Sequence, residues 1–427
     1  MKKFFFTLLP ALLSVPLSAS NGEAHTEKLF NLVNTGDYFH FREEFLADSV
    51  NLDPLYRNYF SVWNNSLFNR PEISEAITRQ LTDSTAMNCP DSLAEHALML
   101  VFQDKLRLSR FREADSICTH LLFRYGSIMD DDEKKGVREA GDLSALLKDI
   151  DPMTVERNGD FSLDYKRDIT NLIRIPVQIN GHANDYVMDT GANFSAITET
   201  QAQEMGLDVR SGNFSITSSS RSSVQARMGV AKEVVIGNAK FRNVVFIVLP
   251  DNSLRFAGGL YKINGIIGLP VLAALGELHI FRKKIVFPVA QEEGPGINLG
   301  FYGNTSFIDL SFFNDHSPFI FDTGAATSVF GPVALHKFSD ALYTTGHGKD
   351  KTARIGGAGG VQKVHIIRCK NVAYEGGGKS GTLKMVTVQV DGNTAAFGMF
   401  SGIAGEDILM QWNEVVINYR KMFVVFR

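Results

Sequence analysis

The strongest constraint on the fold is a segment that occurs twice in this 427-residue chain. The first copy reads Val-Met-Asp-Thr-Gly-Ala at 187–192, and the second reads Ile-Phe-Asp-Thr-Gly-Ala at 320–325. Each copy is followed, 79 or 83 residues after its aspartate, by the last glycine of an apolar-apolar-Gly element, Gly268 or Gly405. A lone Asp-Thr-Gly is usually an ordinary turn, because Asp and Gly are common turn residues. A repeat with matched surroundings indicates a duplicated structural unit instead.

The residues around both copies have the pattern of β-strands. Residues 172–179 are apolar and β-branched, and Asn180-Gly181 is the strongest short-range hairpin signal. Short strands and glycine-rich turns then continue to the C-terminus. Together with the repeat, this pattern predicts two homologous all-β lobes: lobe 1 at 161–290 and lobe 2 at 291–427.

Residues 21–150 carry apolar stripes with helical spacing and few strand signals. Three helix breaks, each followed by a new apolar pattern, begin at Asn34, Phe68 and Arg107, about 35–40 residues apart. The spacing leaves two alternatives open: an array of helical hairpins that resembles tetratricopeptide repeats, and an irregular helical prodomain. Residues 151–160 have the turn composition of a linker between the helical domain and the lobes.

The first 20 residues have the pattern of a secretory signal peptide. Lys2 and Lys3 form a basic start, residues 4–17 are too short an apolar run to span a bilayer comfortably, and residues 18–20 are small. The alternative is an uncleaved anchor. We expect residues 1–20 to be removed and the protein to be exported, to the periplasm or the extracellular space, without stable membrane insertion.

Composition excludes several classes of function. Forty-three Lys and Arg against 47 Asp and Glu leave a formal charge of −4, which offers no global field for binding nucleic acid. Three cysteines cannot supply a disulfide framework, and the sequence leaves open whether Cys89 and Cys118 pair. Zinc-ligand spacing, HExxH and GxSxG are all missing from the sequence, so we expect neither a metal nor another cofactor.

The two Asp-Thr-Gly-Ala segments with their later apolar-apolar-Gly elements resemble the aspartic peptidases of the pepsin and retropepsin type, over about 265 residues. Ala192, Ala325 and the glycine-rich segment 355–360 are similar to retropepsins, whereas two lobes in one chain are similar to pepsin. The chain most resembles secreted bacterial retropepsin-like peptidases of this two-lobed kind. The resemblance implies an α+β multidomain protein, with a bilobal all-β acid-protease domain of the double-ψ type and pseudo-twofold symmetry after the helical domain.

The resemblance also implies an aspartic endopeptidase in which Asp189 and Asp322 activate a water molecule against a protein or peptide substrate. The chemistry of the residues supports this independently. Two carboxyl groups about 3 Å apart cannot both ionise, so the pair holds a base and an acid at the same pH. The ionised member deprotonates the water, and the protonated member donates a hydrogen bond to the substrate carbonyl.

The neighbours of the aspartates have supporting roles. Gly191 and Gly324 lack a Cβ, so their loops can turn tightly and approach each other. In the family, the hydroxyls of Thr190 and Thr323 hydrogen-bond across the lobe interface. The apolar residues before the later glycines are expected to pack behind the aspartate loops; they are Ile266, Ile267, Ile403 and Ala404.

A peptide substrate of such an enzyme lies extended and pairs with flap strands. We place the flaps near 217–229 and 354–361. The second flap supplies the candidate substrate-binding residues, which are Gly356, Gly357, Ala358 and Gly359.

Ala192 and Ala325 also bear on the working pH. A hydroxyl at this position can stabilise the charged carboxylate and lower its pKa, and alanine cannot. We therefore expect activity that extends to mildly acidic or neutral pH.

Other polar residues near the motifs have structural explanations. Ser195 and Ser328 are predicted to be loop hydrogen-bonding residues and not nucleophiles, because no histidine is placed at matching positions in both copies. Glu406 and Asp407 precede a short predicted helix, where capping explains them.

A different class of function remains open. A catalytically inactive protein could use the same two-lobed cleft to bind peptides or act as a scaffold, with the helical repeats recruiting partners. In an enzyme, the helical domain could either contact a protein partner or mask the cleft.

Overall fold

The computed structural model describes residues 21–83, 88–212, 215–217, 223–225, 227–256, 261–345, 351–357, 360–390 and 397–427. The described chain forms two compact units. One is the helical region up to Asp149, together with Gly300–Gly303; the other contains Ile150–Leu299 and Asn304–Arg427. The predicted signal peptide lies outside the described residues. Within the described ranges, no helix combines the length and apolarity needed to cross a bilayer.

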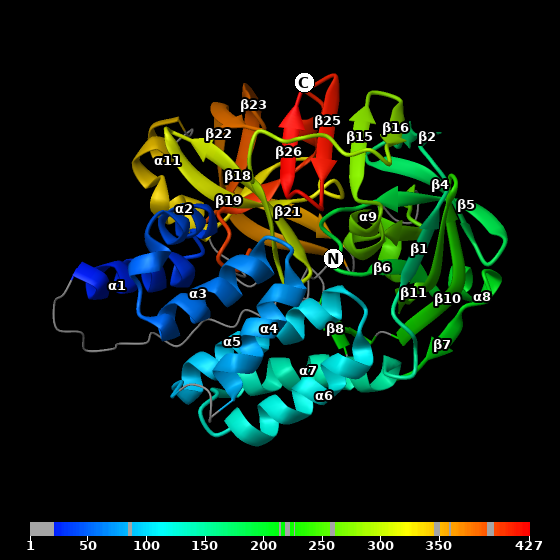
Figure 1. The fold of residues 1–427 in the computed structure, drawn as a ribbon. Helices are drawn as coiled ribbons and strands as arrows, with labels where there is room; N and C mark the ends of the chain where they lie inside the picture. Colours follow the sequence, from blue (N-terminus) through cyan, green and yellow to red (C-terminus); the bar gives the residue numbers. More distant parts are fainter. Residues whose placement is uncertain are drawn as a thin grey trace. The chain divides into compact units, whose positions relative to one another are not determined.

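The first unit is helical, as the apolar periodicity predicts (Figure 1). Its helices are α1 (Asn21–Asn34), α2 (Tyr38–Asp48), α3 (Pro54–Leu67), α4 (Pro71–Thr82), α5 (Asp91–Arg107), α6 (Phe111–His120) and α7 (Asp131–Leu147), with a 3₁₀ turn at Ser49–Asn51 and a π-turn at Leu121–Tyr125. The periodic apolar side chains form its core, among them Phe41, Phe60, Val101, Phe102, Phe111 and Leu147.

The same type of turn ends α1, α3 and α5, at the three predicted breaks. A residue with positive φ follows each helix: Gly36 (φ 76°), Asn69 (φ 58°) and Ser109 (φ 57°). The next amide then bonds back to a carbonyl five residues earlier, which is the Schellman arrangement: Asp37 N to Leu32 O (2.9 Å), Arg70 N to Asn65 O (2.7 Å) and Arg110 N to Lys105 O (2.9 Å). The breaks are therefore confirmed as connections within successive helix pairs. Their relation to tetratricopeptide repeats stays a prediction.

The last helix begins where the sequence places a run of acidic residues. Asp130 and Glu133 form a capping box: the Glu133 amide donates to Asp130 Oδ1 (2.8 Å), and the Asp130 amide donates to Glu133 Oε2 (2.9 Å). Behind α7, the buried Cys118 thiol donates to the carbonyl of Val137. Cys89, Cys118 and Cys369 are all free thiols, so Cys89 and Cys118 do not pair in this structure.

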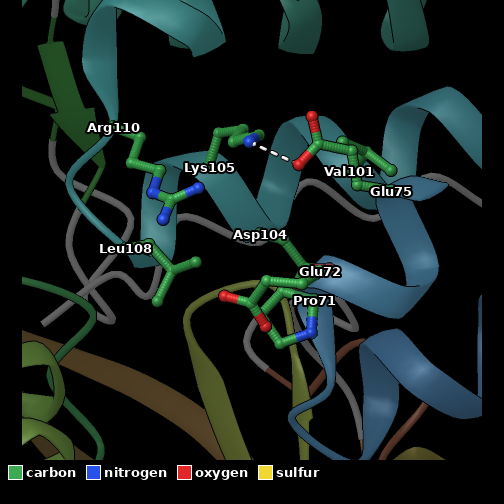
Figure 2. A pocket seen from close by; sticks show the side chains of 8 residues that line it. All are labelled: Pro71, Glu72, Glu75, Val101, Asp104, Lys105, Leu108 and Arg110. Atoms are coloured by element: carbon green, nitrogen blue, oxygen red, sulfur yellow. Dashed lines mark hydrogen bonds and ion pairs between the residues drawn. The ribbon is translucent and has the colours of Figure 1, made fainter.

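A small hollow lies beside α4 and α5 (Figure 2) and encloses about 190 Å³, open solvent included. One buried charge that lines it is Lys105, whose Nζ lies 2.8 Å from Glu75 Oε2 and also contacts Glu113. Figure 2 shows the Lys105–Glu75 contact at its edge. Because carboxylates from both neighbouring helices surround the ammonium group, we assign this cluster to helix packing.

The second unit is β-rich. The sheet of lobe 1 contains β1 (Thr154–Arg157), β3 (Lys166–Arg167), β4 (Ile173–Ile179), β5 (His182–Met188), β6 (Ser195–Thr198), β7 (Asp208–Arg210), β10 (Arg227–Ile236), β11 (Ala239–Leu249) and β14 (Gly265–Ile267). The pairing order is β1-β11-β6-β14-β5-β4-β10-β7. Strand β10 pairs with both β4 and β11, so the sheet closes on itself as a barrel. Because β1 pairs with β11, the predicted linker at 151–160 contains a strand of lobe 1, which therefore begins before residue 161.

The sheet of lobe 2 contains β17 (Leu299–Tyr302), β18 (Thr305–Phe312), β19 (Asp315–Phe321), β20 (Val329–Phe330), β21 (Lys351–Gly357), β22 (Gly360–Gly376), β23 (Lys379–Gln389) and β24 (Gly402–Ala404). The pairing order is β17-β18-β19-β24-β20-β23-β22-β21, and a further β18–β22 pairing closes it in the same way. Short elements complete the unit: α8 (Glu199–Glu204), α9 (Leu269–Ala274), α10 (Pro332–Lys337), α11 (Ser339–Thr345), α12 (Glu406–Leu409), a 3₁₀ turn at Asp251–Leu254, and the paired strands β12 (Arg255–Phe256) and β13 (Tyr261–Lys262).

One set of pairings recurs in both sheets. In lobe 1, β5 runs parallel to β14, β14 is antiparallel to β6, and β6 is parallel to β11. In lobe 2, β19, β24, β20 and β23 repeat these relations in the same order. The strand before each Asp-Thr-Gly therefore lies beside the strand that leads to the later glycine.

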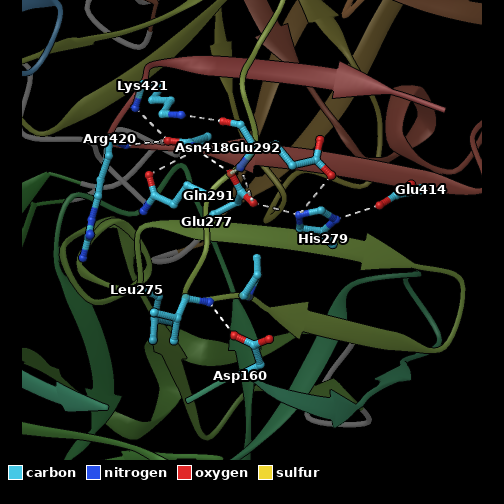
Figure 3. A network of polar contacts seen from close by, with 12 residues as sticks. Asp160, Leu275, Glu277, His279, Gln291, Glu292, Glu414, Asn418, Arg420 and Lys421 are labelled. Carbon is cyan, nitrogen blue, oxygen red and sulfur yellow. Dashed lines mark hydrogen bonds and ion pairs between the residues drawn. The ribbon is translucent and has the colours of Figure 1, made fainter. Parts of the chain in front are cut away.

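A separate sheet joins the two lobes, with the order β2 (Phe161–Asp164), β16 (Lys284–Phe287), β15 (Glu277–Phe281), β25 (Glu414–Asn418) and β26 (Phe423–Phe426). Strand β15 of lobe 1 pairs antiparallel with β25 of lobe 2. Figure 3 shows the polar network on this sheet, where the His279 ring lies between Glu277 (3.0 Å) and Glu414 (2.7 Å). Glu277 is completely buried and also accepts from Asn418 of lobe 2. Polar side chains thus connect the lobes at the same place as the backbone ladder.

Candidate active site

Both motif aspartates lie directly after a buried strand, Asp189 after β5 and Asp322 after β19. The Asp189 amide donates to the carbonyl of Ile267 (3.0 Å), and the Asp322 amide donates to the carbonyl of Ala404 (3.0 Å). Because the parallel neighbour strand supplies the acceptor in both cases, the apolar-apolar-Gly elements fix where each aspartate leaves its sheet.

Each carboxylate is also held by its own loop. The Gly191 amide donates to Asp189 Oδ1 at 2.8 Å, and the Gly324 amide donates to Asp322 Oδ1 at 2.9 Å. A hydrogen bond from a backbone amide stabilises the charged form of a carboxylate and fixes its orientation. The two carboxyl groups are therefore oriented by equivalent contacts.

The threonines bond across the two loops. The Thr190 hydroxyl donates to the carbonyl of Phe321 (2.8 Å) and accepts from the Thr323 amide (3.0 Å). The Thr323 hydroxyl donates to the carbonyl of Met188 (2.9 Å) and accepts from the Thr190 amide (3.1 Å). All four hydrogen bonds are buried, and they form only while the two loops stay together.

The glycines bring the carboxyl groups of the two loops together. A Cβ atom on Gly191 would lie 2.3 Å from the Asp322 Cγ, and one on Gly324 would lie 2.3 Å from the Asp189 Cγ. Each aspartate side chain thus packs on the backbone of the other loop, and no side chain fits between them. The structure places Asp189, Thr190, Gly191, Asp322, Thr323 and Gly324 in one cluster.

Solvent reaches the two loops unequally. Asp189 is 6% exposed, whereas Asp322 is half-buried. The lobe 1 loop continues as buried chain, but Ala326 and Thr327 of the lobe 2 loop are exposed.

Ser195 and Ser328 support the loops from behind, which confirms their predicted role as loop hydrogen-bonding residues. The Ser195 hydroxyl accepts from the Gly268 amide (3.1 Å), and the Ser328 hydroxyl accepts from the Gly405 amide (3.0 Å). The Ser328 hydroxyl also donates to Asp407 Oδ1 (2.6 Å).

Sequence reasoning missed Ser306 on β18. Its hydroxyl lies 3.3 Å from the carbonyl oxygens of both Thr190 and Phe321, at the point where the loops cross. Nothing in the local sequence distinguishes this serine, because its partners come from two different segments.

The capping explanation for Glu406 is wrong. Gly405 is the N-cap residue of α12, and the Glu406 side chain is completely buried, with its Oε2 2.6 Å from Arg167 Nη1. Arg167, on β3 of lobe 1, is a second residue that sequence reasoning missed. Alignment of the two copies could have signalled Glu406, because Leu269 occupies the matching place after Gly268.

Burial raises the pKa of the Glu406 carboxyl to about 7, because the charged form loses its hydration. The Arg167 guanidinium opposes this shift, and the negative charges of Asp322 and Asp407 add to it. The pKa of Asp407 is also raised by burial, while its hydrogen bonds from Ser328 act in the opposite direction. A buried carboxyl group whose pKa is raised to about 7 therefore lies within electrostatic reach of Asp322.

The predicted flaps fall partly outside the described residues. Gly356 and Gly357 end β21, where Gly356 pairs with Val361 and Gly357 with Gly360 of β22. Ala358 and Gly359, between these strands, are not among the described residues. In the first flap region, β8 (Ser215–Thr217) pairs with β9 (Ser223–Gln225). Both regions thus contain antiparallel strand pairs, and the substrate-binding role of the glycines stays a prediction.

One comparison with known proteins matches the segment that contains the first aspartate loop. Residues 175–271, which include Asp189 and Gly268, match the family model described as aspartyl protease, and this match supports an aspartic protease family for the chain. A search of curated proteins found no match. Among solved structures, the chain is similar to a retropepsin-like aspartic protease from Rickettsia conorii, with 20% identity over 31% of this chain and 91% of that one, and a TM-score of 0.23.

Proposed function

We propose that this protein is an aspartic endopeptidase whose active site is formed by Asp189 and Asp322 together. The observation that carries the proposal is the reciprocal packing of the two loops, in which each aspartate Cγ would meet a Cβ on the other loop's glycine at 2.3 Å. Two carboxyl groups placed in this way have to share a proton, because two adjacent like charges are strongly unfavourable. The family match at 175–271 is consistent with this chemistry.

In the proposed mechanism, the ionised member of the pair takes a proton from a water molecule as the oxygen attacks the peptide carbonyl. The protonated member donates a hydrogen bond to the carbonyl oxygen and later helps to protonate the leaving nitrogen. The amides of Gly191 and Gly324 hold one oxygen of each carboxyl group, so the other oxygens are directed to the reaction. The four bonds of Thr190 and Thr323 keep this geometry rigid.

We further propose that lobe 1 and lobe 2 are related by a pseudo-twofold axis between the two aspartates, as in two-lobed retropepsin-like peptidases of secreted bacterial type. The recurring strand pairings and the matched hydrogen bonds of the two loops support this relation. The substrate is a protein or peptide that binds in extended form, and the β21–β22 hairpin is the proposed flap.

Peptide mapping of a digested protein mixture tests the proposed activity. The full chain is compared with Asp189→Ala, Asp322→Ala and a control variant, Asp185→Ala, which changes a carboxylate on the same strand as Asp189. We expect new termini with wild type and Asp185→Ala and none with the other two variants. Equal cleavage by all four proteins would overturn the assignment.

The same variants separate the enzyme from a peptide-binding or scaffold protein. If wild type captures peptides but produces no new termini between acidic and neutral pH, the inactive function is the better description. A variant without residues 21–149 then shows whether the helical unit recruits a partner or masks the site.

We also propose that the protein is exported after removal of residues 1–20, on the basis of the basic start and short apolar run. N-terminal sequencing of protein from the native host tests this proposal. A mature chain that begins near residue 21 outside the cytoplasm supports it, and a chain that keeps residue 1 contradicts it.

A further inference from the structure

An ion pair between the lobes lies next to the proposed active site. Glu406 on α12 of lobe 2 is completely buried, and its Oε2 accepts from Arg167 Nη1 at 2.6 Å. Arg167 belongs to β3 of lobe 1, 239 residues away in the chain. The same Nη1 also donates to the carbonyl of Asn171 (2.6 Å), which fixes the guanidinium in lobe 1. Glu406 Oε1 is buried and has no hydrogen-bond partner among the described residues.

Glu406 is coupled to the Asp322 loop through the backbone. Its amide donates to the carbonyl of Ala325 (2.8 Å), and the Ala325 amide donates to the carbonyl of Asp322 (3.2 Å). The two carboxylates repel each other electrostatically, because ionised Asp322 disfavours ionised Glu406. Electrostatic coupling is reciprocal, so a charge on Glu406 acts in turn on the charge of the proposed dyad.

The groups that face the Glu406 carboxyl come from three elements. Arg167 and Tyr165 approach from lobe 1, and the Tyr165 hydroxyl donates to the carbonyl of Phe281 (2.7 Å). Asp322 faces it from the loop after β19, and Asp407 from α12 itself. Arg167 is therefore the cation that balances Glu406 at this place.

The matching position of lobe 1 has no such charge. The Leu269 amide donates to the carbonyl of Ala192 at 2.8 Å, in the same way as the Glu406 amide donates to Ala325. A leucine at one position and a buried glutamate at the other make the surroundings of the two aspartates electrostatically different.

We propose that Glu406, held by Arg167, is a positioning residue that sets the upper pH limit of the proposed Asp189/Asp322 dyad. This inference rests on the proposed function. Because the pKa of Glu406 is raised to about 7, Arg167 lacks a charged partner at lower pH. As Glu406 ionises near pH 7, the Glu406–Arg167 pair becomes neutral and no longer biases the dyad. If Glu406 carries no charge, Arg167 is an uncompensated cation beside the dyad and favours its second ionisation, which removes the shared proton at lower pH.

The experiment is a double-mutant cycle in the full chain that removes each charge alone and both together. It compares wild type, Glu406→Gln, Arg167→Gln and the double variant. The Glu406→Gln side chain keeps a carbonyl oxygen that accepts from Arg167, so the contact survives while the negative charge is lost. The profile of kcat/KM against pH is measured for each protein. We expect Glu406→Gln to move the alkaline limb down by about one pH unit, the low end of the effect of a nearby opposite charge. In the double variant, two neutral side chains return the limb close to its wild-type position.

Glu277→Gln is the matched control. Glu277 is also completely buried and also contacts the other lobe through Asn418, but it belongs to the sheet that joins the lobes (Figure 3). Its alkaline limb is expected to stay at the wild-type pH. An unchanged limb in Glu406→Gln overturns the proposal, and so does the same shift in Glu277→Gln or a double variant that keeps the full shift.

A readout that does not need cleavage separates this proposal from the proposed function. If wild type cleaves no substrate, the proposed function fails, and the carboxyl ¹³C resonance of Asp322 is titrated in the same proteins. A lower titration midpoint in Glu406→Gln that the double variant reverses supports the electrostatic coupling. Identical titrations in all of these proteins overturn it.

Discussion

The two Asp-Thr-Gly loops have the same hydrogen bonds but different surroundings. Both aspartates accept from the glycine two residues later, and both serines accept from the later glycine. After that glycine, lobe 1 continues with Leu269 and Pro270, whereas lobe 2 continues with Glu406 and Asp407. These matched hydrogen bonds orient the two aspartates in the same way, which an active site formed by both loops requires. The loops differ in exposure and in the charge of the residues behind them, so one aspartate can be made electrostatically distinct from the other while the matched bonds are kept.

The largest expected effect comes from the glycines that pack against the aspartates. In Gly191→Ala or Gly324→Ala, the new Cβ meets the opposite carboxyl carbon at 2.3 Å, so the loops have to move apart. Displacement of catalytic groups by about 1 Å can cost about 100-fold in rate, and overpacking costs about 1–3 kcal/mol of stability. Cleavage rates and denaturant unfolding measure both effects.

Gly159→Ala is the control for this pair. Gly159 has a φ of 72° and no heavy atom within 4 Å of an added Cβ. The variant is expected to lose about 1–2 kcal/mol from backbone strain and to keep its activity. Full activity in both loop variants would show that the close approach of the loops is not required.

The second-largest expected effect concerns Glu406, whose matching position in lobe 1 is occupied by Leu269. Its pKa is raised from 4.5 to about 7 in the folded state, so its contribution to stability is complete below pH 4.5 and is lost as the pH rises through 7. The shift corresponds to about 3 kcal/mol. The free energy of unfolding of wild type, measured relative to Glu406→Gln, is therefore expected to fall by up to this amount between pH 4.5 and 8.

Only the change of the free energy of unfolding with pH is compared between the two proteins. Any effect of the side-chain amide in Glu406→Gln that does not depend on pH therefore cancels. A relative stability that rises over this pH range would mean that attraction to Arg167 outweighs burial. That outcome would reverse the assigned direction of the pKa shift.

Thr190→Val and Thr323→Val test the equivalence of the two loops. Each substitution keeps the side-chain shape but removes the hydroxyl that bonds a buried amide and a buried carbonyl of the other loop. A loss of about 1–3 kcal/mol is expected, of similar size for both variants. Because the bonds are shared, the double variant should lose less than the sum of the two single losses. Urea unfolding measures all three, and strictly additive losses would show that the threonines act independently.

The smallest expected effect distinguishes the two serines. Ser328 bonds both Gly405 and Asp407, while the position equivalent to Asp407 in lobe 1 is Pro270, whose side chain has no acceptor. Ser328→Ala is expected to destabilise the protein by about 1 kcal/mol more than Ser195→Ala, because it removes one further, partly buried hydrogen bond to a carboxylate. Thermal unfolding at a pH where Asp407 is ionised measures the difference; a larger loss in Ser195→Ala would contradict it.

The features that sequence analysis could predict are those written in adjacent residues. The repeated Asp-Thr-Gly placed both loops after strands, and the breaks at Asn34, Phe68 and Arg107 placed the ends of α1, α3 and α5 within a residue. Turn and strand signals act over a few residues, so one sequence is enough to recognise them.

The contacts that could not be predicted join distant segments. Arg167 and Glu406 are 239 residues apart, and neither has a neighbour that marks it as half of an ion pair. The sequence predicts that the strand at Thr154–Arg157 is part of a linker because the residues on both sides of it favour turns, whereas pairing with β11 decides its conformation. Strand pairing depends on context more than on propensity, so such segments are recognised only after the sheet is known.

The central claim is that two loops from different parts of the chain form one active site. The most direct test compares kcat/KM of wild type with Asp189→Asn, Asp322→Asn and the double variant. Residues that act as a unit are not additive, so each single variant is expected to lose at least about 10²–10⁴-fold, and the double variant no more than either one. Single variants that each keep about half of the activity, with the rest lost in the double variant, would show two independent sites and would contradict the claim.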